Sequence, residues 1–299
     1  MELRKCDYST QNNVKGKTCI ITGPTHGIGR ATALTLGKLG ASLFLLCRNI
    51  DKGQNLAAEI EATGGSATVI HADLASLASV YSAASTLQEK APKIDLLINN
   101  AGVLNGEKRI TEDGFEEMFA VNYLAHFLLT TKLLPLLKAA ESARIIHVAS
   151  GAYAFVKAFD FDDYNWQKKT FRAFPAYGHS KLANMLFNHK LAKNLSRTQI
   201  TSNALDPGNV ATGMGTINPV LKLINILLTP FMLTPEQGAS TSIYLAVHPD
   251  AEAHNGKYFI KNRLVSPSPN ALDDHTAERL WEMSESLLEK RGFSSQLNS

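Results

Sequence analysis

Short runs of apolar residues recur along the chain and alternate with segments whose apolar residues are spaced as in helices. Such runs, separated by helical patterns, are typical of buried strands. They lie at 18–23, 42–48, 66–74, 94–102, 143–150, 200–208 and 256–260. Strands that are apolar on both faces and alternate with helices indicate a parallel sheet with helices on each side.

Right-handed crossovers turn this pattern into a doubly wound α/β sheet of the Rossmann type, with about seven parallel strands. The chain contains no internal repeat and no linker rich in proline, glycine or serine, so we expect a single domain over residues 1–299. The helical patterns include a long one from about 113 to 138 and an amphipathic C-terminal one at about 273–290.

One apolar segment, at about 209–235, has two interpretations. From Pro219 it reads PVLKLINILLTPFML, interrupted by Lys222, Asn225 and Pro230. A membrane span needs about 20 apolar residues, so the segment is too short to cross a bilayer. It predicts either a lid over a substrate pocket or an amphipathic helix in peripheral contact with a membrane. Its position after a loop rich in glycine and threonine favours the lid.

Composition narrows the class of protein. With 299 residues, 44% hydrophobic and 19% charged, the chain can bury a sizeable core without disulfides. Its net charge of +3 is spread along the sequence, which argues against nucleic acid as the main partner. Cys19 and Cys47 lie in apolar runs and the cysteine count is odd, so we expect a reducing, cytoplasmic compartment. The N-terminal sequence MELRKCDYST lacks the apolar core of a signal peptide, and no cysteine or histidine pair has metal-ligand spacing.

The first predicted strand is followed at once by TGPTHGIGR. Glycine permits a tight turn and a close approach of the backbone to a ligand, and the start of a helix offers free N–H groups to a phosphate. The spacing G-x-x-x-G-x-G differs from the common G-x-G-x-x-G, and glycine turns also serve packing alone. The position between strand and helix nevertheless favours a dinucleotide site. Its predicted cofactor contacts are Gly23, Thr25, His26, Gly27, Ile28 and Gly29.

The end of the second predicted strand bears on which dinucleotide binds. Sites for NAD usually carry an acidic residue there, whereas an arginine can hold the 2′-phosphate of NADP. This chain has Arg48 and Asn49 and no carboxylate, so we predict NADP(H) rather than NAD; the alternative is a solvated surface arginine. Asp73 and Leu74 follow the third strand, where they reach the adenine or, for Asp73, cap a helix.

A second motif is PAYGHSKLAN, residues 175–184. In a helix, Tyr177 and Lys181 lie one turn apart on one face. Such a pair often occurs by chance, but here it follows a phosphate turn and a serine, Ser150, at the end of the fifth predicted strand. The combination predicts a phenol placed beside an ammonium to move a proton.

Together these motifs resemble, in their order along the chain, those of the short-chain dehydrogenase/reductase family. TGPTHGIG resembles the cofactor turn, NNAG (99–102) the fourth-strand motif, YGHSK the Tyr-x-x-x-Lys pair, and DPG (206–208) the loop that holds the nicotinamide end. The likeness runs from about 16 to about 260 and points to the branch of retinol dehydrogenases and WW-domain oxidoreductases. We expect no WW domain and no N-terminal anchor, so a retinoid substrate does not follow. His26 and Ala149 depart from the pattern without removing a catalytic group.

The resemblance implies the chemistry. Hydride transfer between a nicotinamide and a carbonyl makes or consumes an alkoxide, so a nearby group must give or take a proton. Tyr177 is that group; a free tyrosine titrates near ~10, and the cation of Lys181 favours its phenolate. The resemblance also implies a role for each of three residues: Lys181 bonds the nicotinamide ribose, Ser150 holds the substrate oxygen, and Asn122 supports a water for proton relay. Further implied cofactor contacts are Asn100, Ala101, Gly102, Pro207, Gly208, Val210 and Thr212.

Three polar residues near these motifs are expected to have no part in the chemistry. His147 lies in an apolar strand, and His179 lies on a different helix face from the Tyr177–Lys181 pair. We interpret both histidines as structural, and Ser180 as a bystander.

The substrate side is less defined. The insertion between Ser150 and Tyr177 is rich in aromatic side chains, which either form the apolar wall of a pocket for a hydrophobic alcohol or carbonyl, or pack the insertion onto the domain. A steroid, a retinoid, an aromatic ketone and a lipid aldehyde all stay open. The aromatic residues are Tyr153, Phe155, Phe159, Phe161, Tyr164, Trp166, Phe171 and Phe174.

Two functions fit the motifs. The first is an NADP(H)-dependent oxidoreductase; the second is a regulatory or scaffold protein that binds NADP(H) without turnover. Retention of Asn122, Ser150, Tyr177 and Lys181 together favours the enzyme. By analogy with the family we expect a homodimer or homotetramer, assembled through long helices such as 113–138 and 175–196.

Overall fold

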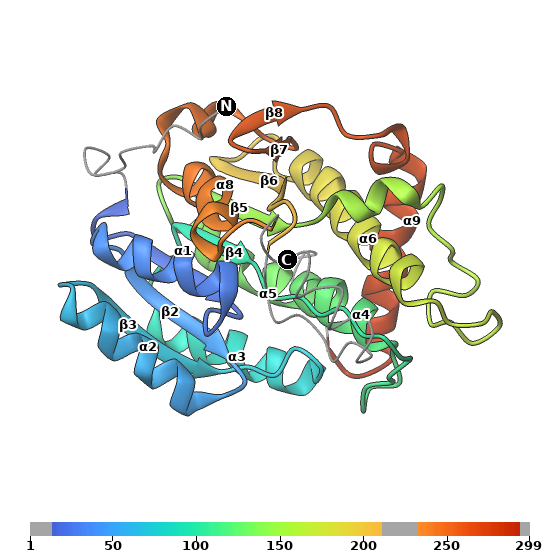
Figure 1. The fold of residues 1–299 in the computed structure, drawn as a ribbon, viewed down its shortest axis with the longest axis horizontal. Coiled ribbons are helices and arrows are strands. Elements are labelled where there is room, and N and C mark those ends of the chain that lie inside the picture. Colours follow the sequence, from blue (N-terminus) through green and yellow to red (C-terminus); the bar gives the residue numbers. More distant parts are fainter. Residues whose placement is uncertain (1–13, 211–231, 294–299) are drawn as a thin grey trace.

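One eight-stranded sheet forms the centre of the computed structural model, which describes residues 14–210 and 232–293 (Figure 1). The strand order is β3-β2-β1-β4-β5-β6-β7-β8, and every neighbouring pair is parallel except β7 and β8. The predicted doubly wound α/β sheet of the Rossmann type is therefore confirmed. The strands are β1 (Thr18–Thr22), β2 (Ser42–Cys47), β3 (Ser66–His71), β4 (Leu96–Asn99), β5 (Ala143–Val148), β6 (Ile200–Asp206), β7 (Tyr258–Ile260) and β8 (Arg263–Val265).

The last strand, β8, is an addition to the predicted set. It pairs antiparallel with β7 across a turn at Lys261 and Asn262, whose φ angles are 51° and 62°. Two consecutive residues with positive φ are typical of the tight hairpin turns that suit the twist of a sheet. Lysine is not a usual residue at such a turn, so the sequence gives little warning of the hairpin.

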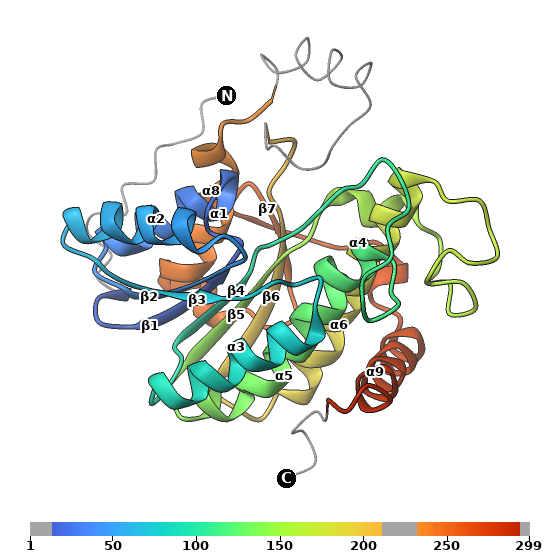
Figure 2. The same ribbon diagram turned by 90° about the horizontal axis from the view of Figure 1, so that it is seen from below.

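Helices cover both faces of the sheet, as Figure 2 shows. One layer consists of α1 (Gly27–Lys38), α2 (Ile50–Ala62) and α8 (Pro235–Val247), and the other of α3 (Leu77–Lys90), α5 (Ala125–Lys138) and α6 (Ala173–Asn194). The C-terminal helix α9 (Asp274–Glu289) packs against α6 and agrees with its predicted bounds to within one residue at each end. The chain therefore has one core on each side of the sheet.

The long helix expected from about 113 begins at Glu117 instead. Residues before it form a turn in which Gly114 has a φ of 82° and Ile110 bridges Glu116. The Glu116 carboxylate then caps the helix by accepting hydrogen bonds from the backbone N–H groups of Met118 and Phe119, at 3.0 and 2.9 Å. The helix continues as α4 (Glu117–Phe119), a π-helical turn (Ala120–Leu124) and α5.

This helical stretch is also the most apolar one. Within the described ranges, Glu117–Lys138 is the single helix long and apolar enough to cross a membrane by length and composition. Of the most apolar 18 residues of this stretch, 89% are buried inside the protein. Its side chains pack on the sheet and on α3 and α6, as expected of a core helix.

Burial of three histidines predicts a pH-dependent stability. Burial lowers the pKa of His126 to about 4, of His147 to about 3 and of His179 to about 4. An unfolded histidine titrates near ~6.5, so below that pH the unfolded chain binds protons that the folded chain does not. The free energy of unfolding should therefore fall from pH 6.5 towards pH 5, by up to about 1.4 kcal/mol per pH unit for each imidazole.

Urea unfolding at pH 7.5, 6.5 and 5 measures this dependence. Replacing His147 by asparagine should make the slope shallower by the contribution of one imidazole. A free energy of unfolding that is constant or higher at pH 5 would contradict buried, neutral histidines.

The carboxyl ends of β1, β4, β5 and β6 meet at one edge of the sheet, because all four strands are parallel. In doubly wound sheets this edge holds the ligand. It is also where the chain places Gly23, Asn100, Ser150 and Pro207.

Candidate active site

The glycine turn joins β1 to α1 and forms a cradle of backbone. Gly23 and Gly27 adopt φ angles of 62° and 51°, which glycine tolerates and most residues do not. A Cβ at Gly29 would lie 2.3 Å from the Gly23 carbonyl oxygen and 2.5 Å from Asn100 Nδ2. No other residue therefore fits at Gly29 without moving the turn.

The start of α1 suits an anion. His26, at the N-cap, makes no side-chain hydrogen bond to the helix, and the first turn contains no acidic residue. Its first N–H groups therefore point outward without a side-chain cap, at the positive end of the helix dipole. The residues of this turn fit the pyrophosphate of a dinucleotide.

Cationic side chains stand beside this turn. Arg48, just after β2, is exposed and makes no hydrogen bond or ion pair with any described residue. The ammonium of Lys52, on α2, lies 3.3 Å from His26 Nε2. The other ring nitrogen, His26 Nδ1, lies 3.0 Å from the Thr25 hydroxyl. Sequence reasoning missed Lys52, whose only signal was its place four residues after Arg48.

Two predicted contacts have structural roles as well. Asn49 caps α2, because its Oδ1 accepts a hydrogen bond from Lys52 N at 2.8 Å. Asp73 accepts from Ala75 N at 3.0 Å, whereas the N-cap of α3 is Ser76. The expectation that Asp73 caps a helix is therefore wrong, since its carboxylate closes the turn that precedes the helix. Leu74 beside it is buried.

The end of β4 is tied to the end of β1 by Thr22, which the sequence did not single out. The Thr22 hydroxyl accepts hydrogen bonds from Asn100 N at 2.9 Å and Ala101 N at 3.0 Å. Asn100 Nδ2 donates to Thr22 O at 2.8 Å. This clamp fixes residues 100–102 against the glycine turn. A Cβ at Gly102 would lie 3.4 Å from both Lys181 Nζ and Asn122 Oδ1, so Gly102 borders the space beside both groups.

Asn122 sits at the centre of the π-helical turn and is fully buried. Its Oδ1 accepts from Val103 N at 2.7 Å, and its Nδ2 donates to Val103 O at 3.0 Å and to Ser180 Oγ at 2.9 Å. Ser180 Oγ in turn donates to Tyr177 O at 2.8 Å. Ser180, which we expect to take no part in the chemistry, has a structural role, because its hydroxyl links Asn122 to the helix that carries Tyr177.

Ser150 and Tyr177 come together because α6 packs closely on the 3₁₀ turn at Gly151–Phe155. Ser150 caps this turn by accepting from Ala152 N at 3.3 Å. A Cβ at Gly178 would lie 2.8 Å from the Ala152 carbonyl oxygen, so only glycine permits the approach. The Ser150 hydroxyl is brought near the Tyr177 phenol as a result, close enough to lower the pKa of the phenol.

The pKa of Tyr177 moves in the direction opposite to the expectation. Burial is the main cause that raises it to about 12; the nearby Ser150 hydroxyl lowers the pKa and the Asp206 carboxylate raises it. Lys181 does not reverse this, because burial lowers its own pKa to about 8 and its ammonium donates to Val148 O at 2.9 Å. Without a ligand, Tyr177 is therefore a protonated phenol, ready to donate.

The last residue of β6 is Asp206, which sequence reasoning used only as part of a motif. Its Oδ1 accepts from Gly208 N at 2.9 Å, and its Oδ2 would lie 3.0 Å from a Cβ at Gly151. Gly208 has a φ of 79°, and Val210 forms a bridge with Leu233. Pro207, Gly208 and Val210 thus lie at the predicted edge of the sheet, whereas Thr212 and most of the proposed lid lie outside the described residues.

The two histidines set aside have structural partners. His147 is buried, with Nε2 3.1 Å from Ser202 Oγ and Nδ1 3.3 Å from Asn99 Nδ2. His179 Nε2 accepts from Asp160 N at 2.6 Å, and its ring stacks on Phe159. Neither imidazole is hydrogen bonded to Ser150, Tyr177 or Lys181.

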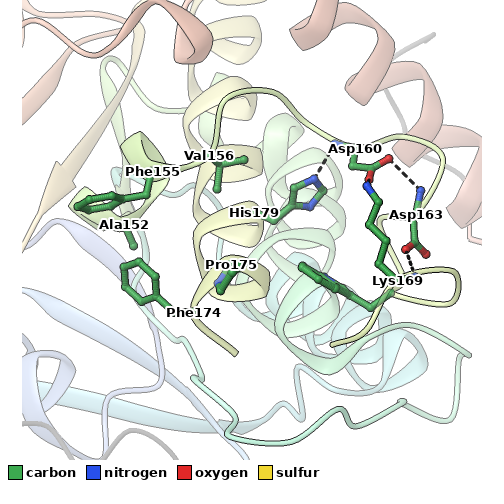
Figure 3. A pocket seen from close by; sticks show the side chains of 10 residues that line it. Ala152, Phe155, Val156, Asp160, Asp163, Lys169, Phe174, Pro175 and His179 are labelled. Carbon is green, nitrogen blue, oxygen red and sulfur yellow. Dashed lines mark hydrogen bonds and ion pairs between the residues drawn. The ribbon is translucent and has the colours of Figure 1, made fainter. Parts of the chain in front are cut away.

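A cavity of about 220 Å³ lies beside the start of α6 (Figure 3). Phe155, Phe174 and Ala152 lie at one end and His179, Asp160 and Lys169 at the other. Ala152 and Trp166 line this cavity and also belong to the apolar cluster around Tyr177. The cavity therefore adjoins the surroundings of the phenol.

The aromatic residues of the insertion have divided roles. Tyr153 and Phe159 are buried and pack the insertion on the domain, as Tyr153 does against Tyr258. Phe155 and Phe174 are 78% and 51% exposed and contact each other edge to face. Exposed aromatic side chains at a cavity are available to an apolar ligand. In the described part of the chain, no group of three histidine, cysteine or acidic residues is placed to hold a metal ion.

Comparison with known proteins agrees with this geometry. The family model for short chain dehydrogenase matches residues 17–219. Mouse retinol dehydrogenase 14 is 41% identical over 286 residues, which cover 90% of this chain and 85% of that protein. A solved structure of an uncharacterized protein from Mycobacterium paratuberculosis is 27% identical with a TM-score of 0.77, covering 97% of this chain and 98% of that one. The NADP complex of RhlG from Pseudomonas aeruginosa is 27% identical with a TM-score of 0.67, covering 84% and 96%.

Proposed function

We propose that this chain, which belongs to the short-chain dehydrogenase family, transfers a hydride between NADP(H) and a hydrophobic alcohol or carbonyl compound. The observation that carries the proposal is the meeting of four side chains at the ligand edge of the sheet, next to the glycine turn. They are Asn122, Ser150, Tyr177 and Lys181.

The bound nicotinamide supplies or accepts the hydride. Tyr177 gives its phenolic proton to the carbonyl oxygen as the alkoxide forms, and takes it back in the reverse direction. The Ser150 hydroxyl, which lies near the Tyr177 phenol, holds that oxygen in reach.

Lys181 has two tasks in this scheme. Its ammonium, buried and bonded to Val148 O, would stabilise the phenolate that remains after proton transfer, and it would hold the ribose hydroxyls of the nicotinamide half of a bound cofactor. Asn122 holds residue 103 and the start of α6 in place through its amide. As the family resemblance implies, Asn122 and Lys181 would support a water through which a proton from solvent returns to Tyr177.

The preference for NADP(H) is supported by charge at the turn. Arg48 is an exposed arginine without a partner among the described residues, Lys52 reaches the same turn, and neither of the two residues directly after β2 is a carboxylate. A similar solved structure holds NADP. Cys19 and Cys47 are free and buried, which supports a reducing compartment.

The substrate class is proposed from the cavity and from the relatives. The cavity offers apolar and aromatic walls that include Phe155, Phe174 and Trp166, and through Ala152 and Trp166 it adjoins the cluster around Tyr177. Curated relatives at 41% identity are named for retinol, a long apolar alcohol. A screen of NADPH consumption over retinal, an aromatic ketone, a steroid ketone and a long-chain aldehyde tests the class. Turnover of small polar carbonyls alone would contradict it.

Replacing Arg48 by aspartate should weaken the binding of NADPH far more than the binding of NADH. A charge-assisted bond to a phosphate is worth about 1.5–3 kcal/mol, so we expect a rise of about 10- to 100-fold in the Kd for NADPH and little change for NADH. Quenching or enhancement of cofactor fluorescence measures both constants. Arg263→Asp, an exposed arginine on β8, is the control and should change neither. Equal losses for NADPH and NADH would contradict the phosphate assignment.

A further inference from the structure

One buried imidazole connects the cofactor turn to Asn122. His126 lies one helical turn after Asn122, at the start of α5, and is 2% exposed. Its Nε2 lies 2.9 Å from Thr22 Oγ1, and its Nδ1 lies 3.1 Å from the backbone carbonyl oxygen of Asn122. Both ring nitrogens therefore have a partner, and the two partners belong to opposite sides of the site.

The hydrogen bonds of Thr22 determine the tautomer of this ring. Its hydroxyl oxygen already accepts from Asn100 N and Ala101 N, which fills both lone pairs. The hydroxyl must then donate its own hydrogen. Ile98 O lies at 3.5 Å, whereas His126 Nε2 lies at 2.9 Å and is the better acceptor by distance.

It follows that Nε2 of His126 accepts and that the single ring proton is on Nδ1. The Nδ1–H group then donates to Asn122 O. A neutral ring fits the site, since burial and the positive charge of Lys181 both disfavour an imidazolium there. With a pKa of about 4, His126 stays neutral at physiological pH and takes no part as an acid or base.

Beyond Asn122 the chain of hydrogen bonds continues to the catalytic helix. The Asn122 amide bonds Val103 and Ser180, and Ser180 bonds the carbonyl of Tyr177. Every link is buried or nearly so, which makes each bond costly to leave unmade. The backbone of residues 100–101, the glycine turn and the start of α6 are thus held by one network.

We propose that His126 is a positioning residue that couples the cofactor turn to the catalytic helix. Its Thr22 side holds the turn and the ends of β1 and β4 in the form that binds the cofactor. Its Asn122 side holds Asn122, and through Ser180 the backbone at Tyr177. The proposal rests on the proposed function, but its two sides have separate readouts.

Two amide substitutions distinguish the two hydrogen bonds of the His126 ring, because each keeps one bond and removes the other. In His126→Asn the amide nitrogen takes the place of Nδ1 and bonds Asn122 O but does not reach Thr22. In His126→Gln the longer amide takes the place of Nε2 and bonds Thr22 but not Asn122 O. His126→Leu removes both bonds at a similar volume.

The Kd for NADPH and kcat at saturating NADPH are measured for each variant. A buried bond left unmade costs enough to change either constant about 10- to 100-fold, so we expect His126→Leu to raise Kd and to lower kcat by such factors. His126→Asn should restore kcat to within about threefold while Kd stays raised, and His126→Gln should do the reverse.

The matched control is His147→Asn, a buried and neutral histidine that is not in this network. It should lower the free energy of unfolding and leave kcat per folded molecule and Kd unchanged. The proposal is overturned if activity and NADPH binding of the His126 variants fall only in proportion to their folded fraction. It is also overturned if His126→Leu changes neither kcat nor Kd.

A readout without cofactor or substrate tests the tautomer itself. Long-range ¹⁵N–¹H spectra of the wild-type chain with ¹⁵N-histidine, assigned by the signal missing in His126→Asn, should show a neutral ring protonated on Nδ1 at pH 7. A proton on Nε2, or an imidazolium, would overturn the proposal. Absence of wild-type turnover would contradict the proposed function alone, because Kd and the tautomer are measured without it.

Discussion

Replacing Tyr177 by phenylalanine should lower kcat by about a thousandfold or more, while the Kd for NADPH changes by no more than about twofold. The phenyl ring keeps the contacts of Tyr177 with Met118, Ala152 and Ala176, so the fold and the cofactor turn are expected to stay intact. What is lost is the phenolic hydroxyl with its proton, beside the Ser150 hydroxyl. A general acid of this kind contributes about 10²–10⁴-fold to a rate.

A second tyrosine provides the control for this experiment. Tyr153 is buried like Tyr177, and its hydroxyl accepts a hydrogen bond from Ser268 N at 3.1 Å without touching the proposed site. Tyr153→Phe should lower stability slightly and change kcat less than about threefold. Full activity in Tyr177→Phe, or equal losses in the two variants, would contradict the role of Tyr177 as proton donor.

Replacing Gly29 by alanine should destroy most of the affinity for NADPH. The new Cβ would lie 2.3 Å from the Gly23 carbonyl oxygen, which is backbone and is held by Asn100 Nδ2 at 3.3 Å. The turn must open to admit the methyl group, so we expect the Kd to rise at least about tenfold and the free energy of unfolding to fall by about 1–3 kcal/mol.

The sign of the stability change is informative, because alanine in a helix is usually better than glycine by about 1 kcal/mol. Gly64→Ala is the control. Gly64 has a φ of 84° and nothing within 4 Å of a Cβ, so alanine costs about 1–2 kcal/mol of backbone strain there and leaves the Kd unchanged. Titration with NADPH and urea unfolding report the two quantities. A more stable Gly29→Ala chain with normal affinity would contradict the cradle.

The fold followed from the sequence because its signals are local. Each of β1, β2 and β4 contains a continuous apolar run, and the glycine turn follows the first run directly. The exception, β8, depends on a hairpin at Lys261 and Asn262 whose residues are unusual for the turn they form. Local reasoning fails where the backbone conformation does not follow residue preference.

The predicted catalytic residues also come together, but their environment was not predictable. Whether Lys181 or burial decides the pKa of Tyr177 depends on how much water α6 and the turn after β5 exclude, which only the packed structure shows. Likewise Thr22, His126 and Ser180 owe their roles to partners far away along the chain. A histidine four residues after Asn122 on one helix face was the single available signal for His126.

Deuterium transfer from NADPH labelled at C4 of the nicotinamide tests the proposed function most directly. With a hydrophobic aldehyde or ketone that the protein consumes, the label should appear on the carbinol carbon of the alcohol, and Tyr177→Phe should form this product about a thousandfold more slowly. A chain that binds NADPH tightly yet yields no labelled alcohol from retinal, aromatic ketone, steroid ketone or long-chain aldehyde would contradict hydride transfer. That result would identify the protein as a cofactor-binding regulator.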